Sequence, residues 1–320
     1  DPAVSDFAAT VTSGRPVLTD GGIETRVMFE TPIHMDPDVQ VAALLDHRDG
    51  RMKLESVYSG YVEAAREFSL PVVIGTPTFR ASPNFIRRAG LPEEDIGRLN
   101  RQAAGFLKDV REKGGHEPVF IGGVIGPSGD AYLPGQALPA AQAAEYHRPQ
   151  AEALAVAGVD FLFAPTFPSV DEAEGACMAM ARTGVPHVVS FILGPEGDVL
   201  DGTPLAEAIR RIDDNPDARP LYFSLSCIHA LAAAEAVAKL KADSTSAYER
   251  LAEFKANGSP LRTDRLIQLD HPETDDPETF AAEMAGLYDP AGLHILGGCC
   301  GTDDTHMRAL ARLLADQGPD

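Results

Sequence analysis

Residues 119–164 read VFIGGVIGPSGDAYLPGQALPAAQAAEYHRPQAEALAVAGVDFLFA, and this stretch contains one complete unit of the pattern that decides the fold. A short segment rich in β-branched residues (119–125) is followed by a loop marked by glycine and proline (126–138). An amphipathic segment with helical spacing (140–157) and a second apolar segment (160–164) come next. Strand, crossover helix and strand in this order predict two parallel strands of one sheet.

The same alternation extends through the chain in both directions. Eight segments are candidate strands: 16–19, 71–75, 119–125, 160–164, 187–193, 221–226, 252–256 and 293–297. Candidate helices lie between them: 53–68, 95–113, 140–157, 170–183, 205–212, 230–241, 277–288 and 303–314. Eight strands is the number of a (β/α)8 TIM barrel, so we expect an α/β protein with one barrel domain over residues 1–320.

An open, doubly wound sheet is the structural alternative. Its usual glycine-rich phosphate fingerprint is missing, because the TDGG stretch at 19–22 lacks the required spacing. The candidate strand 252–256 is the least distinctive, since residues 251–255 also fit a helix. The longest irregular pieces, 29–51 and 126–138, follow the first and third strands, where a barrel carries its catalytic loops.

Composition narrows the partner classes. The chain has 320 residues, 44% of them hydrophobic, and 27 Lys and Arg against 48 Asp and Glu, a formal charge of −21. Such a charge repels nucleic acid and anionic membranes. The sequence contains neither a membrane-length apolar run nor a signal-like start, so we expect a soluble, cytoplasmic protein. It does not decide whether the chain forms a homo-oligomer.

Three of the four cysteines predict a metal site. Four cysteines are too few for the disulfide framework of a small secreted fold. Cys227, Cys299 and Cys300 directly follow predicted strands six and eight, so they can meet at one rim of a barrel. Three thiolates leave one position of a tetrahedral zinc open for a substrate thiol. The alternative is a core cysteine, Cys227, and a redox-active or inert Cys299–Cys300 pair.

Four motifs in order resemble the homocysteine S-methyltransferase family, a group of zinc barrels. The strongest is GGCCGT at 297–302, which is similar to the family's glycine-flanked Cys-Cys signature. TDGG at 19–22, TPTFRA at 76–81 and GGVIGP at 122–127 support it. The resemblance covers nearly the whole chain and implies a TIM barrel that methylates the thiol of homocysteine.

The resemblance also implies roles for individual residues. Cys227, Cys299 and Cys300 would be the zinc ligands and the catalytic residues, with Zn2+ as the cofactor. Asp20 would face the amino group of the acceptor, although a turn role before two glycines is the ordinary alternative. The substrate-binding set would comprise Asp20, Gly21, Gly22, Thr76, Thr78 and Ser226, with the glycine N–H groups as carboxylate donors.

Two residues depart from the family pattern. Pro165 stands where the family usually has a Glu that helps to hold the homocysteine ammonium. Losing a charged hydrogen bond costs about 1.5–3 kcal/mol, so either another carboxylate substitutes or the acceptor is not homocysteine. Ser226 stands in place of an Asn beside the metal and has a shorter reach.

Other candidates receive the ordinary interpretation. A ligand role for His229 would fill the open metal position, and Cys177 lies among small apolar residues typical of a core. Glu24, Tyr58 and Tyr132 are pocket candidates without a decisive signal.

The expected reaction moves a methyl group from a small onium donor to a zinc-bound thiol, giving methionine if the thiol is homocysteine. S-methylmethionine or S-adenosylmethionine is favoured over a betaine, and Phe29, Phe79, Tyr132 and Phe167 are the aromatic candidates for cation recognition. The expected partners are thus a small-molecule thiol and a methyl donor. The alternatives are an altered acceptor, a donor-demethylating enzyme, or a non-catalytic zinc or ligand sensor.

Overall fold

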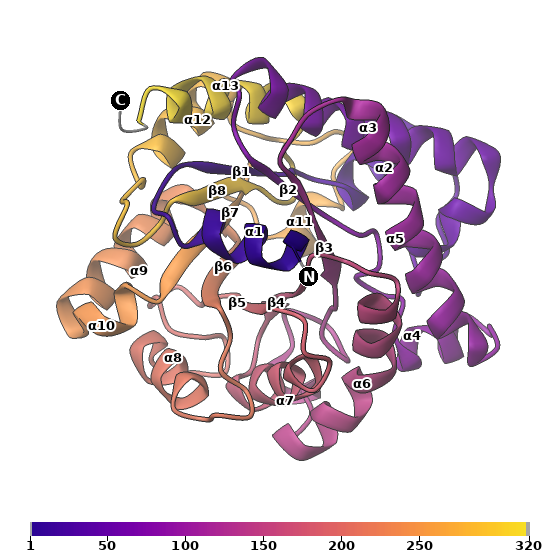
Figure 1. Ribbon diagram of the computed structural model, residues 1–320, viewed down its shortest axis with the longest axis horizontal. Helices are drawn as coiled ribbons and strands as arrows, with labels where there is room; N and C mark the ends of the chain where they lie inside the picture. The colour runs from indigo at the N-terminus through magenta and orange to yellow at the C-terminus, as the bar shows by residue number, and fades with distance from the viewer. Residues whose placement is uncertain (1, 318–320) are drawn as a thin grey trace.

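Eight parallel strands close into a barrel in the computed structural model, which describes residues 2–317. Each strand pairs with its neighbours in sequence, and β1 pairs with β8 to complete the ring (Figure 1). The strands are β1 Val17–Thr19, β2 Val72–Gly75, β3 Val119–Val124, β4 Phe161–Phe167, β5 His187–Phe191, β6 Tyr222–His229, β7 Leu251–Asn257 and β8 Ile295–Gly298. The predicted TIM barrel and all eight predicted strands are confirmed.

The eight predicted helices are also present and form the outer layer. They are α3 Arg48–Glu67, α5 Glu94–Gly114, α6 Ala140–Val156, α7 Val170–Ala181, α8 Leu205–Asp213, α9 Ala230–Asp243, α12 Pro277–Ala285 and α13 Asp304–Ala315. Their amphipathic spacing buries one face against the strands, as Leu54, Val57 and Tyr61 of α3 illustrate.

Shorter elements occupy the connections. They are α1 Pro2–Val11, α2 Glu24–Glu30, η1 Val41–Asp46, α4 Pro83–Arg88, η2 Pro134–Gln136, α10 Thr245–Tyr248 and α11 Thr263–Leu266. The prediction that 29–51 is irregular was wrong in part. Val41, Leu44 and Leu45 are buried in the core, which explains why a 3₁₀ helix forms there.

Helix α1 closes the amino-terminal end of the barrel and crosses the ring of strands in Figure 1. Its Phe7 is fully buried and stacks on Phe161, with the ring centroids 4.3 Å apart. Phe120 and Tyr222, from the starts of β3 and β6, belong to the same apolar cluster. With this end filled, the open end lies at the carboxyl termini of the strands.

Strands β4 and β6 each continue three residues beyond their predicted ends, to Phe167 and His229. The pairing register shifts between Ala164 and Phe167 in β4, and between Ser226 and Ile228 in β6. A β-bulge inserts an extra residue and re-aims side chains, and bulges are common beside active sites. Cys227 therefore lies inside a bulged strand, not past its end.

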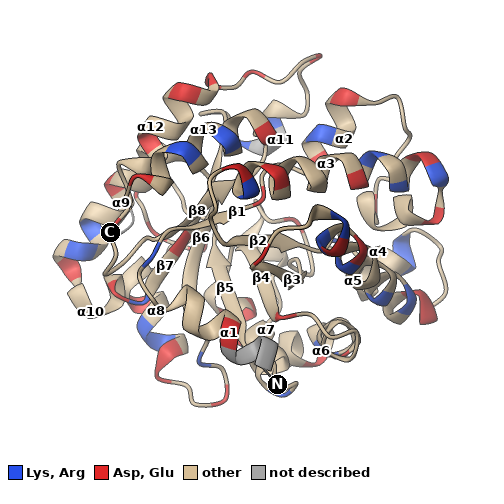
Figure 2. Ribbon diagram, turned by 45° about the horizontal axis from the view of Figure 1, so that its top comes forward, with Lys and Arg blue, Asp and Glu red and all other residues tan. Residues whose placement is uncertain are grey.

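Acidic and basic residues are interspersed along the outer helices (Figure 2). Many of them form surface ion pairs, such as Arg98 with Asp46 at 2.7 Å. Among residues 2–317, no helix combines the length and apolar character needed to cross a bilayer.

Candidate active site and metal centre

A cavity of about 250 Å³ opens at the carboxyl ends of the strands. Its wall includes Asp20 after β1, Pro165 of β4, Lys255 of β7 and the cysteines of β6 and the β8 loop. The cavity continues inward to Phe161 and Glu253 in the barrel interior. This is the end at which TIM-barrel enzymes carry their active sites.

Cys227 reaches the cavity because its backbone leaves strand geometry. Its φ is +58°, in the left-handed region that non-glycine residues rarely occupy, and it is the extra residue of the β6 bulge. Such strain is typical of functional sites, where the surrounding structure compensates for it. The bulge turns a side chain at the end of β6 toward Cys299.

Cys299 and Cys300 follow β8 in a tight loop. Cys299 N–H donates to Ala256 O at 2.7 Å, and Gly258 N–H donates to Cys300 O at 2.9 Å, so β7 holds both residues. Gly301 has a φ of +78°, a conformation that favours glycine. A Cβ on Gly298 would lie 2.2 Å from Thr302 Oγ1, so this position has no room for a side chain.

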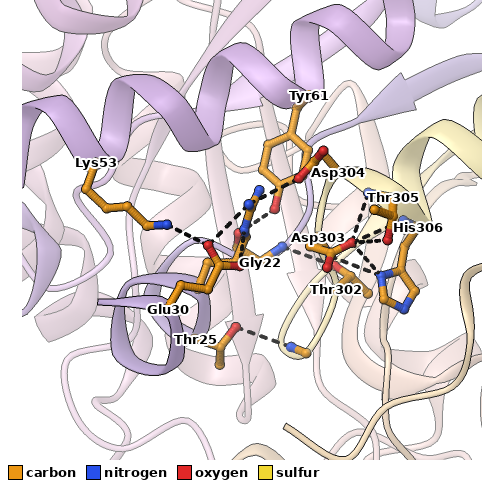
Figure 3. A network of polar contacts seen from close by, with 12 residues as sticks. Gly22, Thr25, Glu30, Lys53, Tyr61, Thr302, Asp303, Asp304, Thr305 and His306 are labelled. Atoms are coloured by element: carbon orange, nitrogen blue, oxygen red, sulfur yellow. Dashed lines mark hydrogen bonds and ion pairs between the residues drawn. The ribbon is translucent and has the colours of Figure 1, made fainter. Parts of the chain in front are cut away.

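A polar network attaches this loop to the segment after β1 (Figure 3). Gly22 N–H donates to Thr302 Oγ1 at 3.1 Å, and Thr302 Oγ1–H donates to Cys299 O at 2.7 Å. Gly301 N–H donates to Thr25 Oγ1 at 3.2 Å, and Arg26 pairs with Asp304 at 3.1 Å. These contacts therefore tie the cysteine loop to the segment after β1.

The three sulfurs form one cluster. The Sγ atoms of Cys227, Cys299 and Cys300 lie within 4.8 Å of one another, and the Cys227 and Cys299 sulfurs are 2.7 Å apart. Hydrogen bonds from Cys227 and Cys300 hold the pKa of Cys299 well below its ordinary value, with Lys255 contributing. Hydrogen bonds with Cys299 and Cys300, together with burial, raise the pKa of Cys227. One thiolate is thus favoured even without a metal.

The donor set fits a zinc ion. Zinc in proteins takes thiolate ligands in tetrahedral geometry at about 2.3 Å, which places sulfurs roughly 3.8 Å apart. All three sulfurs lie within 4.8 Å of one another, and the Cys227 and Cys299 sulfurs, 2.7 Å apart, would have to separate by about 1 Å to bind the ion. Cys227, Cys299 and Cys300 would hold the ion and would leave one of its four tetrahedral positions for another ligand.

Asp20 and Lys255 form a buried ion pair on the cavity wall. The Lys255 ammonium contacts Asp20 Oδ1, and it also lies 3.2 Å from Thr19 Oγ1. The other carboxylate oxygen of Asp20 accepts from Gly75 N–H at 2.7 Å. Although burial lowers the pKa of Lys255, the carboxylates of Asp20 and Glu253 raise it above its ordinary value. Asp20 thus lies in the predicted cavity, but a side chain of the protein already holds it.

A second carboxyl group lies deeper in the barrel. Glu253 is almost fully buried and accepts from Tyr222 Oη–H at 3.0 Å. Burial raises the pKa of Glu253 to about 7, with the Lys255 charge opposing the rise. Lys255 and Glu253 were not predicted as site residues. Alternating charges at two inward positions of a barrel strand were the signal that could have revealed them.

The remaining predicted substrate residues lie in and around the cavity. Gly21, Gly22, Thr76 and Ser226 line it, whereas Thr78 does not reach it. Gly22 N–H is already donated to Thr302. The Thr76 hydroxyl accepts from Val124 N–H, and the Thr78 hydroxyl donates to Val124 O. These threonines therefore connect β2 to β3.

Ser226 connects two bulged strands. Its hydroxyl accepts from Thr166 N–H at 3.0 Å and contacts Ser190 Oγ at 2.7 Å. Thr166 is in the left-handed region, with a φ of +58°. Ser226 therefore supports the backbone beside Cys227 as well as lining the cavity.

Glu24, Tyr58 and Tyr132, named from the sequence without a decisive signal, all line the cavity. Arg80, which the sequence did not single out, lines it too. Of the aromatic candidates, Phe79 and Tyr132 reach the cavity, whereas Phe167 is fully buried and Phe29 lies beside a separate hollow behind the cysteine loop.

His229 and Cys177, which received the ordinary interpretation, do not line the cavity. His229 pairs with Asp275 at 2.7 Å, and its Nδ1 accepts from Leu231 N–H at the start of α9. An Nδ1 that accepts leaves the proton on Nε2, which faces Asp275, so the ring is occupied in the polar network. Cys177 is fully buried in α7, where burial raises the pKa of its thiol.

A family model for homocysteine S-methyltransferases matches residues 17–314. The chain belongs to the homocysteine S-methyltransferase family. It is therefore a thiol S-methyltransferase, which confirms the resemblance inferred from the four motifs.

Several curated proteins are similar over most of the chain. Betaine–homocysteine S-methyltransferase 1 of Bos taurus is 25% identical over 327 residues, covering 95% of this chain and 74% of its own length. The Mus musculus counterpart is 27% identical over 77% of this chain, but over only 61% of its own length. Homocysteine S-methyltransferase of Escherichia coli is 25% identical, covering 80% of this chain and 83% of its own length.

A solved structure shares the fold. The metallated form of the homocysteine methyltransferase MmuM from Escherichia coli superposes with a TM-score of 0.73 and 19% sequence identity. The match covers 93% of this chain and 96% of MmuM, so the two proteins share the same barrel along nearly their whole length.

Proposed function

We propose that this family member transfers a methyl group from a small onium donor to the thiol of homocysteine at a zinc site formed by Cys227, Cys299 and Cys300. The observation that carries the proposal is the cluster of three sulfurs in the cavity wall. Cys227 joins this cluster because the β6 bulge holds its backbone in a strained conformation.

The chemistry requires a nucleophilic sulfur at neutral pH. A free thiol has a pKa of about 8.5 and is largely protonated there. Zinc, when bound, would lower the pKa of a coordinated substrate thiol. The ammonium of Lys255, whose charge already favours the Cys299 thiolate, would compensate part of the negative charge of the cluster.

The methyl transfer is a nucleophilic displacement at the methyl carbon. The acceptor sulfur attacks the donor methyl carbon and forms a new S–C bond, while the bond from that carbon to the onium atom breaks. The electron pair of the broken bond leaves with the onium atom, which becomes a neutral thioether or amine. The acceptor thiol proton is released to solvent. Alignment of the two substrates in the cavity supplies much of the rate enhancement.

A cationic donor suits the cavity wall. The aromatic residues Phe79 and Tyr132 line the cavity. Aromatic faces attract onium groups most strongly where water is excluded. S-methylmethionine and S-adenosylmethionine are the favoured donors, ahead of a betaine.

The proposal is tested by incubating zinc-loaded protein with homocysteine and, separately, S-methylmethionine, S-adenosylmethionine and glycine betaine. Mass spectrometry of the products should show methionine with at least one donor, and Cys299→Ser should abolish it. Loss of donor without a methylated thiol would instead identify a demethylase. Zinc binding without any turnover would identify a sensor.

A further inference from the structure

Glu24 and Arg80 line the cavity, and neither forms an ion pair with a described side chain. They differ from Asp20, both of whose carboxylate oxygens are engaged, one by Lys255 and one by Gly75 N–H. Lys255 is in turn held by Thr19 and by the Asp20 backbone carbonyl. The Asp20–Lys255 pair is therefore electrically complete and offers little to an incoming ammonium.

Glu24 lies at the first position of α2 and lines the cavity. Among the residues whose side chains the structure describes, none donates a hydrogen bond to its carboxyl group and no cation lies within ion-pair distance of it. Burial raises the pKa of Glu24 to about 7, with the negative charges of Cys299 and Asp20 adding to the rise, and the Glu24 backbone N–H and the charge of Arg80 opposing it. A carboxylate there therefore lacks the ion-pair partner that buried charges normally have.

Arg80 lies on the loop after β2 and lines the same cavity. Its guanidinium lies over the Phe85 ring, 4.8 Å from the centroid, and Nη1 donates to Pro37 O at 3.3 Å. In the described part of the chain, no carboxylate approaches within 4 Å of it. Burial lowers the pKa of Arg80, with nearby acidic groups opposing the change. Most of its five donors are therefore available to a ligand.

A carboxylate and a guanidinium that line one small cavity without ion-pair partners are complementary to a zwitterion. An α-amino acid carries an ammonium and a carboxylate on one carbon, so it could satisfy both charges at once. Planar guanidinium groups recognise carboxylates through paired N–H donors. The same cavity wall holds the three cysteines, which places a side-chain thiol of that amino acid within reach of the metal cluster.

We propose that Glu24 binds the ammonium and Arg80 the carboxylate of the amino-acid acceptor, and that Asp20 serves instead to hold Lys255. This inference rests on the proposed function, and it deepens that function by naming the residues that select an amino-acid thiol. It also accounts for Pro165, because the carboxylate absent from β4 is supplied by Glu24 at the start of α2. Glu24 and Arg80 are thus specificity-determining residues.

Three thiols distinguish the ammonium contact of Glu24 from the carboxylate contact of Arg80. L-homocysteine has both charged groups, 4-mercaptobutyrate lacks the ammonium, and 3-aminopropane-1-thiol lacks the carboxylate. Binding of each to zinc-loaded protein is measured by isothermal titration calorimetry, and the zinc content of every variant by elemental mass spectrometry. Glu63→Gln, at an exposed acidic residue of α3, is the surface control.

Glu24→Gln should weaken homocysteine and 3-aminopropane-1-thiol about 10- to 100-fold while leaving 4-mercaptobutyrate unchanged. Arg80→Met should show the mirrored pattern, weakening homocysteine and 4-mercaptobutyrate and sparing the aminothiol. Zinc content should stay constant in both variants. A role of Glu24 as a simple helix-start acid would change stability without this selectivity.

Equal weakening of all three thiols by Glu24→Gln would overturn the inference, as would unmodified protein that binds 4-mercaptobutyrate as tightly as homocysteine. In either case, methylation of homocysteine would show that the proposed function still stands. Binding of none of the three thiols to the zinc-loaded protein would refute both.

Discussion

Lys255 of β7 pairs with Asp20 after β1, and the two side chains, only 12% and 6% exposed, join strands on either side of β8 in the wall of the cavity. Breaking a buried pair by removing one partner is costly, because the other charge is left without compensation. The pair therefore belongs to the framework of the site as well as to its electrostatics.

Lys255→Met should destabilise the protein by about 3–5 kcal/mol, and Asp20→Asn by a similar amount. Each substitution leaves the charge of the other residue buried without an ion-pair partner. The double variant should lose much less than the sum of the two. Urea unfolding of the four proteins measures this coupling. Strictly additive losses would mean that the two groups do not interact in solution.

Zinc content should fall from about one ion per chain to near zero in each of the variants Cys227→Ser, Cys299→Ser and Cys300→Ser. All three thiolates are needed to hold the ion. Cys177→Ala, at a buried cysteine of α7, should retain the metal. Elemental analysis of purified protein provides the measurement. Full occupancy in all three serine variants would refute the assignment of the ligands.

Gly298→Ala should distort the cysteine loop, because its Cβ would lie 2.2 Å from Thr302 Oγ1 and 2.8 Å from Met307 Cε. Overpacking of this kind costs about 1–3 kcal/mol, and displacement of Thr302 should also weaken zinc binding. Thermal unfolding and a competition titration with a zinc chelator report the two effects. Gly105→Ala on α5, where a Cβ meets nothing within 4 Å, is the matched control and should leave both unchanged.

Glu172 should make stability depend on acid pH. This fully buried carboxylate accepts from Ser128 N–H at 2.6 Å, Leu138 N–H at 3.0 Å and His147 Nε2 at 3.0 Å, so it fixes both ends of the loop after β3. Although burial raises its pKa, the hydrogen bond and charge of His147 and the backbone donors lower it below the ordinary value of 4.5.

A lowered pKa means that the folded protein prefers the ionised form, so this stabilisation is complete well above pH 4.5 and is lost as the pH falls through the folded-state pKa. Glu172→Gln should cost about 1.5–3 kcal/mol at pH 7, and the difference from the unmodified protein should shrink toward pH 3. Urea unfolding across this range measures the difference. A pH-independent difference would assign the loss to packing.

The barrel was predictable because its signals are local. Each strand is a short apolar segment between glycine or proline loops, and each helix buries one periodic face, so 119–164 already defines the unit that repeats. The same locality explains the metal prediction. Cysteines at the carboxyl ends of strands six and eight converge because both strands run parallel to strand seven, on either side of it.

The sequence did not reveal which charges in the cavity would be paired, because pairing depends on distance across the barrel. Lys255 and Asp20 are separated by 235 residues, and only the closure of β1, β8 and β7 brings them together. The bulge at Cys227 is likewise a property of pairing between β6 and β7. By itself, the sequence determined the fold, the family motifs and the three thiols. The tertiary structure alone decided that Asp20 has an ion-pair partner while Glu24 and Arg80 have none among the described side chains, because the energy of a buried charge depends on the atoms that surround it in space.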